Sequence, residues 1–192
     1  MTDIAAAINA IDKINAEDPN QELVDGVSYP SELLHSIRLT DEILSLDPQA
    51  GPELLVAARS QHIARWKVPR SSYPEGKVAY LTWRKDLAKM HAAVTSEILL
   101  QLGFEDAFIK RVQEINLKQN LKLDKEVQTM EDGLCLVFMK YQLEKFLLSQ
   151  SSEKMITILQ KSWKKMSGQG RNEALKIKFS PAARELVLSA IT

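Results

Sequence analysis

Apolar residues recur three or four positions apart along almost the entire chain, and no segment sustains a strict alternation of apolar and polar residues. Helices that bury one face have this spacing, whereas a half-buried strand alternates every second residue. The pattern therefore predicts an all-α fold, a single-domain helical bundle. The expected helices cover about residues 3–17, 31–46, 53–66 and 78–102, then one from about 105, a long one over 127–150 and shorter ones to the end.

Proline and glycine mark where these helices end. The first helix must stop before Pro19, because the residue ahead of a proline is pushed out of helical geometry, and a polar loop follows. The segment "DPQAGP" (47–52) predicts a tight turn, so the helices on either side should pack antiparallel. "KVPRSSYPEG" (67–76) predicts a loop, and Ser180 with Pro181 predicts the start of the last helix.

The size and composition of the chain fit one soluble domain. It has 192 residues, 45% of them hydrophobic and 26% charged, which predicts a single all-α domain over residues 1–192. No apolar run approaches the ~18 residues that a bilayer span requires, and no basic leader precedes the first apolar residues. The lone cysteine, Cys135, cannot form an internal disulfide. We therefore expect a cytoplasmic protein that does not associate with membranes.

Charge is unevenly distributed along this chain of zero net charge. Residues 1–56 hold eleven acids and two bases, whereas residues 57–90 hold eight bases and two acids. A basic segment in a neutral protein indicates either an anionic ligand or contact with the acidic part of the same chain. The sequence leaves both explanations open.

Three histidines and one aspartate are candidates for a buried site. His35, His62 and His91 lie on separate predicted helices, and apolar neighbours at helical spacing place each on an inward face. Asp132 enters the most apolar helix, where an unpaired carboxylate is costly. Ordinary hydrogen bonds could satisfy each ring, but inward faces on different helices favour one shared site. We predict these four residues as ligands of a divalent zinc, iron, manganese or magnesium ion.

Part of the chain resembles the HD superfamily of metal-dependent phosphohydrolases. The similar segments are "ELLHS" (32–36), "AARSQHIARW" (57–66) and "MEDGLCLVF" (130–138). The resemblance implies that His35 is the first metal-binding histidine and Asp132 the final aspartate. The family's His-Asp pair reads Gln61-His62 here. Gln61 is expected to lie beside the metal without binding it strongly, and His91 is expected to replace the missing ligand.

Across its whole length the chain also resembles an uncharacterised family, a domain of unknown function. The similar segments are "INAEDP" (14–19), "QHIARWKVPRSSYP" (61–74), "YLTWRKDL" (80–87) and "SWKKMS" (162–167). This likeness implies a helical fold and no particular activity. The HD-like core would cover about residues 30–150.

Basic and aromatic residues surround the predicted loop at 67–76. Arginine's planar guanidinium suits phosphate, and flat rings can stack on a nucleotide base. The phosphate-binding candidates are Arg65, Arg70, Arg84 and Lys85, and the stacking candidates are Trp66, Tyr73 and Trp83. Solvated surface charge and ordinary packing are the alternative interpretations of these residues.

Two further signals carry less weight. "WKKMSGQGR" (163–171) resembles the KMSKS loop of class I aminoacyl-tRNA synthetases, but the chain lacks a HIGH-type partner motif and a parallel-sheet pattern. Lys165 is therefore expected to close a helix. Cys135 lies in an apolar run, whereas reactive thiols need a polar and accessible setting, so we expect it to pack in the core.

These observations favour a metal-dependent phosphohydrolase acting on a small phosphoester or nucleotide, in which the metal lowers the pKa of a bound water. The alternative is a non-catalytic helical binding or regulatory module with a degenerate metal site, for which Gln61 is the main evidence. Nucleic-acid binding through residues 65–85 is a third hypothesis, weakened by the zero net charge. The expected partner is an anionic small molecule.

Overall fold

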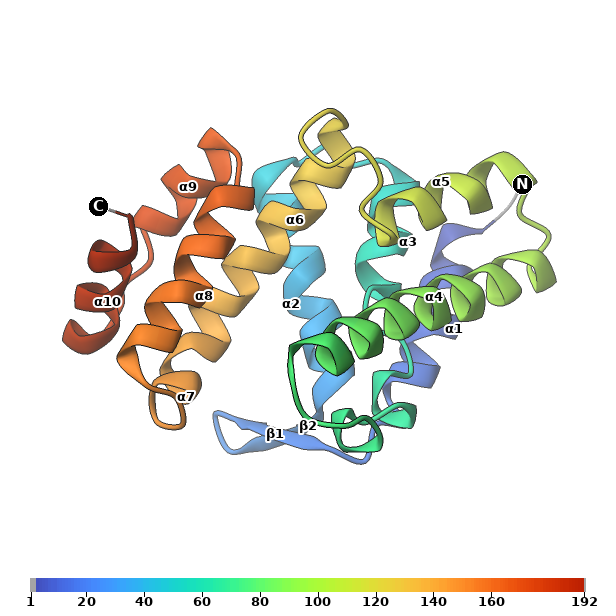
Figure 1. Ribbon diagram of the computed structural model, residues 1–192. Coiled ribbons are helices and arrows are strands. Elements are labelled where there is room, and N and C mark those ends of the chain that lie inside the picture. The colour runs from blue at the N-terminus through green and yellow to red at the C-terminus, as the bar shows by residue number, and fades with distance from the viewer. Residues whose placement is uncertain (1–2, 192) are drawn as a thin grey trace.

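The computed structural model describes residues 3–191, and helices form nearly all of its regular structure (Figure 1). This confirms the predicted all-α helical bundle. The α-helices are α1 (Ile4–Asn15), α2 (Ser31–Leu46), α3 (Pro52–Ser60), α4 (Lys77–Gln101), α5 (Asp106–Asn116), α6 (Lys125–Val137), α7 (Leu143–Leu147), α8 (Ser152–Lys165), α9 (Gly168–Leu175) and α10 (Pro181–Ile191). Short helical turns are η1 (Arg65–Lys67), η2 (Arg70–Ser72) and the π-helical η3 (Phe138–Gln142). Within residues 3–191, no helix combines the length and the apolar character needed to cross a bilayer.

Side-chain caps explain where several helices begin. Asp3 accepts a hydrogen bond from the backbone N–H of Ala5 at the start of α1. Ser180 accepts one from the N–H of Ala183, as predicted for the last helix. Such caps satisfy backbone donors that have no partner in the first helical turn. The helices α2 and α3 run antiparallel (Figure 1), as the short turn between them predicts.

A β-hairpin occupies the segment that the sequence predicts as a polar loop. The strands β1 (Gln21–Val24) and β2 (Val27–Pro30) pair antiparallel, so the loop prediction was wrong here. The turn residues Asp25 and Gly26 have φ angles of +49° and +81°. An Asp-Gly pair is a strong hairpin signal because both residues tolerate positive φ. The strands were missed because they are too short and too exposed to show alternation.

The helix α3 ends at Ser60, six residues before the predicted end at 66. Ile63 and Ala64 remain buried beyond it, so the apolar pattern continues after the helix has stopped. Ala64 adopts a left-handed conformation, with φ of +55°, which a residue with a side chain seldom takes. The chain therefore leaves α3 through a turn at residues 61–64, which contains Gln61 and His62.

The long helix predicted over 127–150 is interrupted. Helix α6 ends at Val137, and the π-helical turn η3 leads into the short α7. A π-turn inserts one extra residue and rotates the side chains that follow, and such turns are frequent at functional sites. The prediction that this segment is central was right, because α6 is buried along most of its length.

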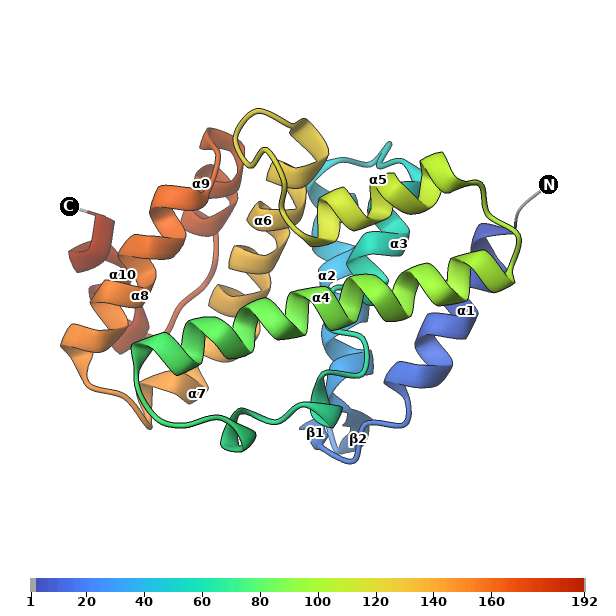
Figure 2. The same ribbon diagram turned by 45° about the vertical axis from the view of Figure 1, so that its right-hand side comes forward.

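Helix α6 belongs to both hydrophobic clusters of the molecule. In one cluster α6 packs with the five helices α1 to α5. In the other it packs with the four helices α7 to α10 (Figures 1 and 2). Gly133 allows close packing of α6 on α2, because a Cβ there would lie 3.1 Å from side-chain atoms of Leu39 and Ile43. Interior packing is dense enough that one added methyl group forces such neighbours to move.

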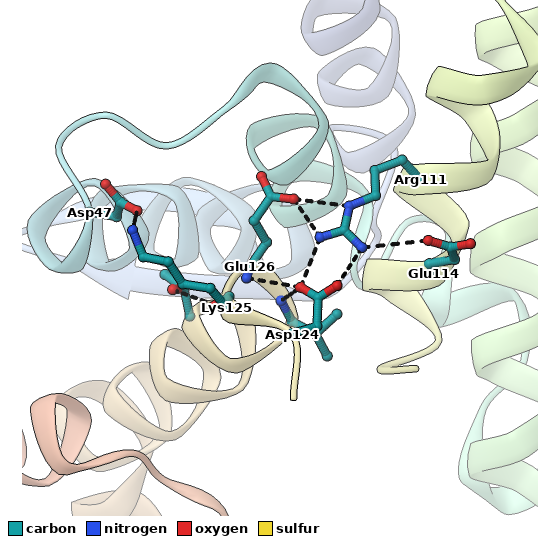
Figure 3. Close-up of polar contacts among 8 residues, drawn as sticks. Asp47, Arg111, Glu114, Asp124, Lys125 and Glu126 are labelled. Atoms are coloured by element: carbon teal, nitrogen blue, oxygen red, sulfur yellow. Dashed lines mark hydrogen bonds and ion pairs between the residues drawn. The ribbon is translucent and has the colours of Figure 1, made fainter. Parts of the chain in front are cut away.

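An ion-pair cluster fixes the start of α6 against α5 (Figure 3). Arg111 on α5 donates two hydrogen bonds to the carboxylate of Asp124, at 2.7 and 2.8 Å, and also pairs with Glu126. These bonds hold the pKa of Asp124 down at about 2. Asp124 also caps α6 through the backbone N–H groups of Glu126 and Val127. The loop between the two helices, which contains Lys118, is therefore held at both ends.

Candidate functional site

A cavity of about 430 Å³ lies between the N-terminal half of α4 and the helices α6, α7 and α8. Figure 2 shows α4 crossing this side of the molecule. The turn after α3 and the end of α5 contribute the remaining wall. The charged, amide, imidazole and thiol side chains that line the cavity, together with Tyr80 and Trp83, are Gln61, His62, Arg65, Tyr80, Trp83, Arg84, His91, Asn116, Lys118, Glu131, Cys135, Gln142 and Lys165.

The three predicted histidines come together, although they belong to separate segments. The rings of His35 and His62 stack with 4.3 Å between their centroids and 12° between their planes. The ring of His91 lies 6.0 Å from that of His62 and is tilted by 39°. His62 and His91 line the cavity, whereas His35 packs on His62 and is not part of the lining.

All three imidazoles have lowered pKa values. Burial is the main cause in each case and brings the pKa of His91 to about 4. The pKa values of His35 and His62 fall well below the ordinary value, because each is buried and each has a cationic or basic neighbour. For His35 that neighbour is His62, and for His62 it is Arg65. The rings are therefore neutral near pH 7, so each has one protonated nitrogen and one nitrogen that can accept a hydrogen bond.

The hydrogen bond of His91 defines its tautomer. Its Nδ1 lies 2.7 Å from the backbone carbonyl oxygen of Ile63. A carbonyl oxygen can only accept a hydrogen bond, so Nδ1 carries the proton and donates the hydrogen bond. In the neutral ring Nε2 is then the acceptor. His91 thus holds the chain just after the turn at Gln61 and His62.

Glu32 is a site residue that sequence reasoning missed. Its Oε2 lies 3.4 Å from His62 Nδ1, and its Oε1 lies 3.8 Å from Arg65 Nε. Burial raises the pKa of Glu32, and the Arg65 guanidinium partly offsets this. Glu32 is in the first turn of α2, three residues before His35, so both side chains lie on one helical face. That spacing could have indicated it.

The three rings do not form a ligand set for one metal ion in this arrangement. Nitrogen lone pairs lie in the plane of each ring, so the stacked His35 and His62 present π-faces to each other. Tetrahedral ligands instead direct lone pairs at a common point. His91 Nδ1 is also occupied by Ile63. Within residues 3–191, no group of three histidine, cysteine, aspartate or glutamate side chains could hold a metal ion.

Asp132 has its hydrogen-bonding partners at the start of α9. Its carboxylate accepts hydrogen bonds from the backbone N–H of Ser167 at 2.8 Å, from the Ser167 hydroxyl at 2.5 Å and from Gln128 Nε2 at 3.0 Å. Gly170 also packs against it. The buried carboxylate is thus stabilised by neutral donors and by the positive end of a helix. The structure brings the three histidines together but gives Asp132 other partners.

Two of the four predicted phosphate-binding cations line the cavity. Arg65 and Arg84 do so, and Arg84 has no ion-pair partner among residues 3–191. Arg70 instead donates hydrogen bonds to the carbonyl oxygens of Tyr73 and Pro74 and stiffens its own loop. Lys85 is exposed on α4 and is not part of the lining.

The predicted stacking residues also divide. Trp83 lines the cavity and is 7% exposed, and its indole N–H donates to the carbonyl of Val68. The Tyr73 hydroxyl donates a hydrogen bond to the carboxylate of Asp86 and so holds the loop against α4. Trp66 packs against the first hydrophobic cluster. Tyr80, which the sequence did not single out, lines the cavity with its ring centroid 5.8 Å from that of Trp83.

A buried carboxylate with two lysines forms another part of the wall. Glu131 is 3% exposed and pairs with Lys118, and with Lys165 at 3.1 Å. Burial raises the pKa of Glu131, but its two ion pairs outweigh this and hold the pKa below the usual value. Lys165 does end α8 as predicted, and it also reaches the cavity. Lys118 was missed because a left-handed turn, with φ of +55°, redirects it.

The structure shows the intramolecular explanation for two cations of the basic segment, and the anionic ligand stays a prediction. Arg59 pairs with Asp12 at 2.8 Å, and Arg65 lies 3.8 Å from Glu32, so two cations contact the acidic N-terminal part. Arg84 has no such partner within residues 3–191 and lines the cavity instead. The cavity therefore retains positive charge that the chain does not neutralise.

A comparison with protein families matches the model of the domain of unknown function DUF4202 to residues 5–187. The chain belongs to the DUF4202 family. No curated protein and no solved structure matches it. Membership of DUF4202 confirms the whole-length resemblance and assigns no activity, so the function must be inferred from the cavity.

Proposed function

We propose that the cavity binds a phosphorylated small molecule. The observation that supports this is its charge: Arg65, Arg84, Lys118 and Lys165 line it, against one carboxylate, Glu131. Cations that line the same cavity repel one another and destabilise the folded protein, and a bound anion removes this repulsion. A phosphate group supplies such an anion and offers several acceptor oxygens to these donors.

The distribution of ion pairs indicates where phosphate would bind. Glu131 is shared by Lys118 and Lys165, so it can neutralise only one of these two cations. Arg84 has no carboxylate partner within residues 3–191. Arg65 shares Glu32 with His62 at distances above 3 Å, and its Nη1 lies 3.4 Å from the His62 ring nitrogens. A phosphate oxygen is a stronger acceptor that could replace these long contacts.

The size and aromatic residues of the cavity suit a ligand larger than phosphate. A volume of about 430 Å³ lies in the range of small-molecule sites. Trp83 and Tyr80 supply flat rings beside Arg84, and Arg65 lies 5.2 Å from the Trp83 ring centroid. A nucleotide base could stack there, and its phosphate could reach the cations.

Titration calorimetry with inorganic pyrophosphate and with adenosine 5′-monophosphate tests this proposal. Arg84→Gln should weaken binding of both ligands by roughly tenfold or more, because hydrogen bonds to charged groups contribute about 1.5–3 kcal/mol. Lys85→Gln is the matched control, since Lys85 is the next residue on the same helix and lies outside the cavity lining. Absence of binding by both ligands, or equal effects of the two substitutions, would overturn the proposal.

Hydrolysis of the bound phosphoester is a second candidate function, and the Glu32–His62 contact favours it. In a neutral His62 that directs Nδ1–H at Glu32, Nε2 is the accepting nitrogen, and Arg65 Nη1 faces it at 3.4 Å. Nε2 would accept a proton once Arg65 turns to the phosphate of the ligand. His62 would take a proton from water as the water oxygen attacks phosphorus and the ester oxygen leaves with the electrons of its bond. General base catalysis of this kind contributes roughly 10²- to 10⁴-fold to a rate.

A panel of nucleotides and phosphoesters, assayed for released phosphate, tests hydrolysis. His62→Gln should lower the rate by roughly 100-fold or more while leaving pyrophosphate affinity nearly unchanged, because Gln lacks a basic nitrogen. His35→Gln serves as the comparison, since His35 lies outside the cavity lining. Turnover that survives in His62→Gln would remove His62 as the base.

Metal-dependent hydrolysis stays a prediction. The order of His35 on α2, His62 after α3 and Asp132 on α6 is the order that the likeness to HD phosphohydrolases requires. In the observed arrangement His62 would have to leave its stack and Asp132 its bonds to Ser167, so we derive no step through a metal. Elemental analysis of protein purified without a histidine tag tests the prediction: near-stoichiometric metal that His62→Ala removes would support it.

A further inference from the structure

Two amide side chains that line the cavity contain buried oxygens without a partner. Gln61 is 6% exposed and Asn116 is 2% exposed, and both belong to the cavity wall. Among residues 3–191, nothing donates a hydrogen bond to Gln61 Oε1 or to Asn116 Oδ1. Buried polar atoms are nearly always hydrogen-bonded in folded proteins, so an exception in a cavity wall needs an explanation, and a ligand that donates to it is one.

The hydrogen bonds of Ser60 fix the orientation of Asn116. The Ser60 hydroxyl donates its single proton to the backbone carbonyl of Val56 at 2.9 Å. It can therefore only accept from Asn116, whose Nδ2 lies 3.0 Å away. The amide nitrogen must face Ser60, and the unpartnered atom is an acceptor. Ser60 directly precedes Gln61, so the two amides are anchored to the same end of α3.

A third acceptor belongs to the same wall. His91 donates from Nδ1 to Ile63, and its lowered pKa keeps Nε2 unprotonated near pH 7. The side chains of the cavity wall thus carry two kinds of hydrogen-bonding group. Its arginines and lysines can only donate hydrogen bonds, whereas Gln61 Oε1, Asn116 Oδ1 and His91 Nε2 can only accept them.

We propose that the phosphorylated ligand also carries hydroxyl or amino groups, which donate hydrogen bonds to Gln61 and Asn116. This inference rests on the proposed phosphate binding and narrows the ligand class to sugar phosphates and nucleotides. Pyrophosphate and simple alkyl phosphates satisfy the cations but leave both amide oxygens without a donor. A site with buried acceptors discriminates strongly against ligands that cannot donate to them.

Three ligands with the same phosphate separate the possible sources of the donor. Adenosine 5′-monophosphate has sugar hydroxyls and an amine, its 2′,3′-dideoxy analogue lacks the hydroxyls, and purine riboside 5′-monophosphate lacks the amine. Loss of the relevant donor should weaken binding to the wild-type protein by roughly fivefold or more. The weaker of the two analogues identifies whether hydroxyl or amine is recognised.

Gln61→Met and Asn116→Leu remove one acceptor each with little change in side-chain volume. In either variant the ratio of dissociation constants between the ligand that lacks the donor and the ligand that has it should fall towards one. Arg84→Gln should weaken binding of all three ligands and leave this ratio unchanged. Gln61→Met should also raise the thermal unfolding midpoint of the ligand-free protein, because it removes a buried acceptor that has no partner. If one of the two substitutions prevents folding, the other gives the same test.

The outcomes distinguish this inference from the proposed function. Binding of all three ligands with equal affinity, together with an effect of Arg84→Gln, would retain the phosphate site and overturn the donor recognition; ordered water then satisfies the amides. A preference that persists in both Gln61→Met and Asn116→Leu would also overturn it. Absence of binding by all three ligands, together with no binding of pyrophosphate, would overturn both proposals.

Discussion

The imidazole rings of His35 and His62 stack nearly parallel, with 4.3 Å between their centroids, and Glu32 contacts the second ring at 3.4 Å. A proton on either ring would place a positive charge against the other ring and near Arg65. The stack therefore depends on both rings staying neutral, and burial is what keeps them so.

The first prediction concerns stability at acid pH. Unfolded histidines take up protons as the pH falls below about 6.5, whereas folded His91 does so only near pH 4. The unfolded state then binds more protons, so the free energy of unfolding should fall as the pH drops from about 6.5 to about 4. Urea denaturation at several pH values measures this fall. In His91→Asn, which keeps a donor for Ile63, the fall should be smaller, and an unchanged pH dependence would contradict the prediction.

A second prediction uses two glycines of α9. A Cβ at Gly170 would lie 2.6 Å from Asp132 Cγ, whereas a Cβ at Gly168 would meet nothing within 4 Å. Gly170→Ala should lower the free energy of unfolding by roughly 1–3 kcal/mol through overpacking. Gly168→Ala should leave stability unchanged or raise it by up to about 1 kcal/mol. Equal effects of the two substitutions would show that α9 does not pack on Asp132 as described.

The third prediction concerns Asp132 itself. Asp132→Ala removes a buried carboxylate and leaves the Ser167 backbone N–H without its acceptor. The free energy of unfolding should fall by roughly 1–3 kcal/mol. Thermal and chemical denaturation measure this loss, with circular dichroism to check the fold. Unchanged stability, with loss of bound metal, would instead assign Asp132 to a metal site.

Glu131 leads to a fourth prediction with two opposite effects. Glu131→Gln removes the carboxylate shared by Lys118 and Lys165, so the ligand-free protein should be destabilised by roughly 1–3 kcal/mol. The same change removes the negative charge that competes with a bound anion, so pyrophosphate should bind more tightly. Calorimetry and denaturation on one preparation measure both effects. Weaker pyrophosphate binding would indicate that Glu131 positions the lysines for the ligand.

The sequence by itself determined the fold class and most helix positions, because helical periodicity and capping residues are local properties. It also predicted His35 and His91 on inward helix faces from their spacing, whereas His62 lies in the turn after α3, where helical spacing no longer applies. It did not predict the end of α3. Ile63 and Ala64 stay buried after the helix stops, so the apolar pattern continues through the left-handed turn and does not reveal it.

Only the tertiary structure decided which polar residues meet. Asp132 and Glu131 are adjacent on α6, yet Asp132 accepts hydrogen bonds from Ser167 at the start of α9 and Glu131 pairs with two lysines. Neighbours on a helix point about 100° apart, so they meet different partners. Lys118 and Lys165 are distant in sequence and share a carboxylate through the packing of α5, α6 and α8. Which side chains line the cavity depends on these non-local contacts, and no local pattern of residues encodes them.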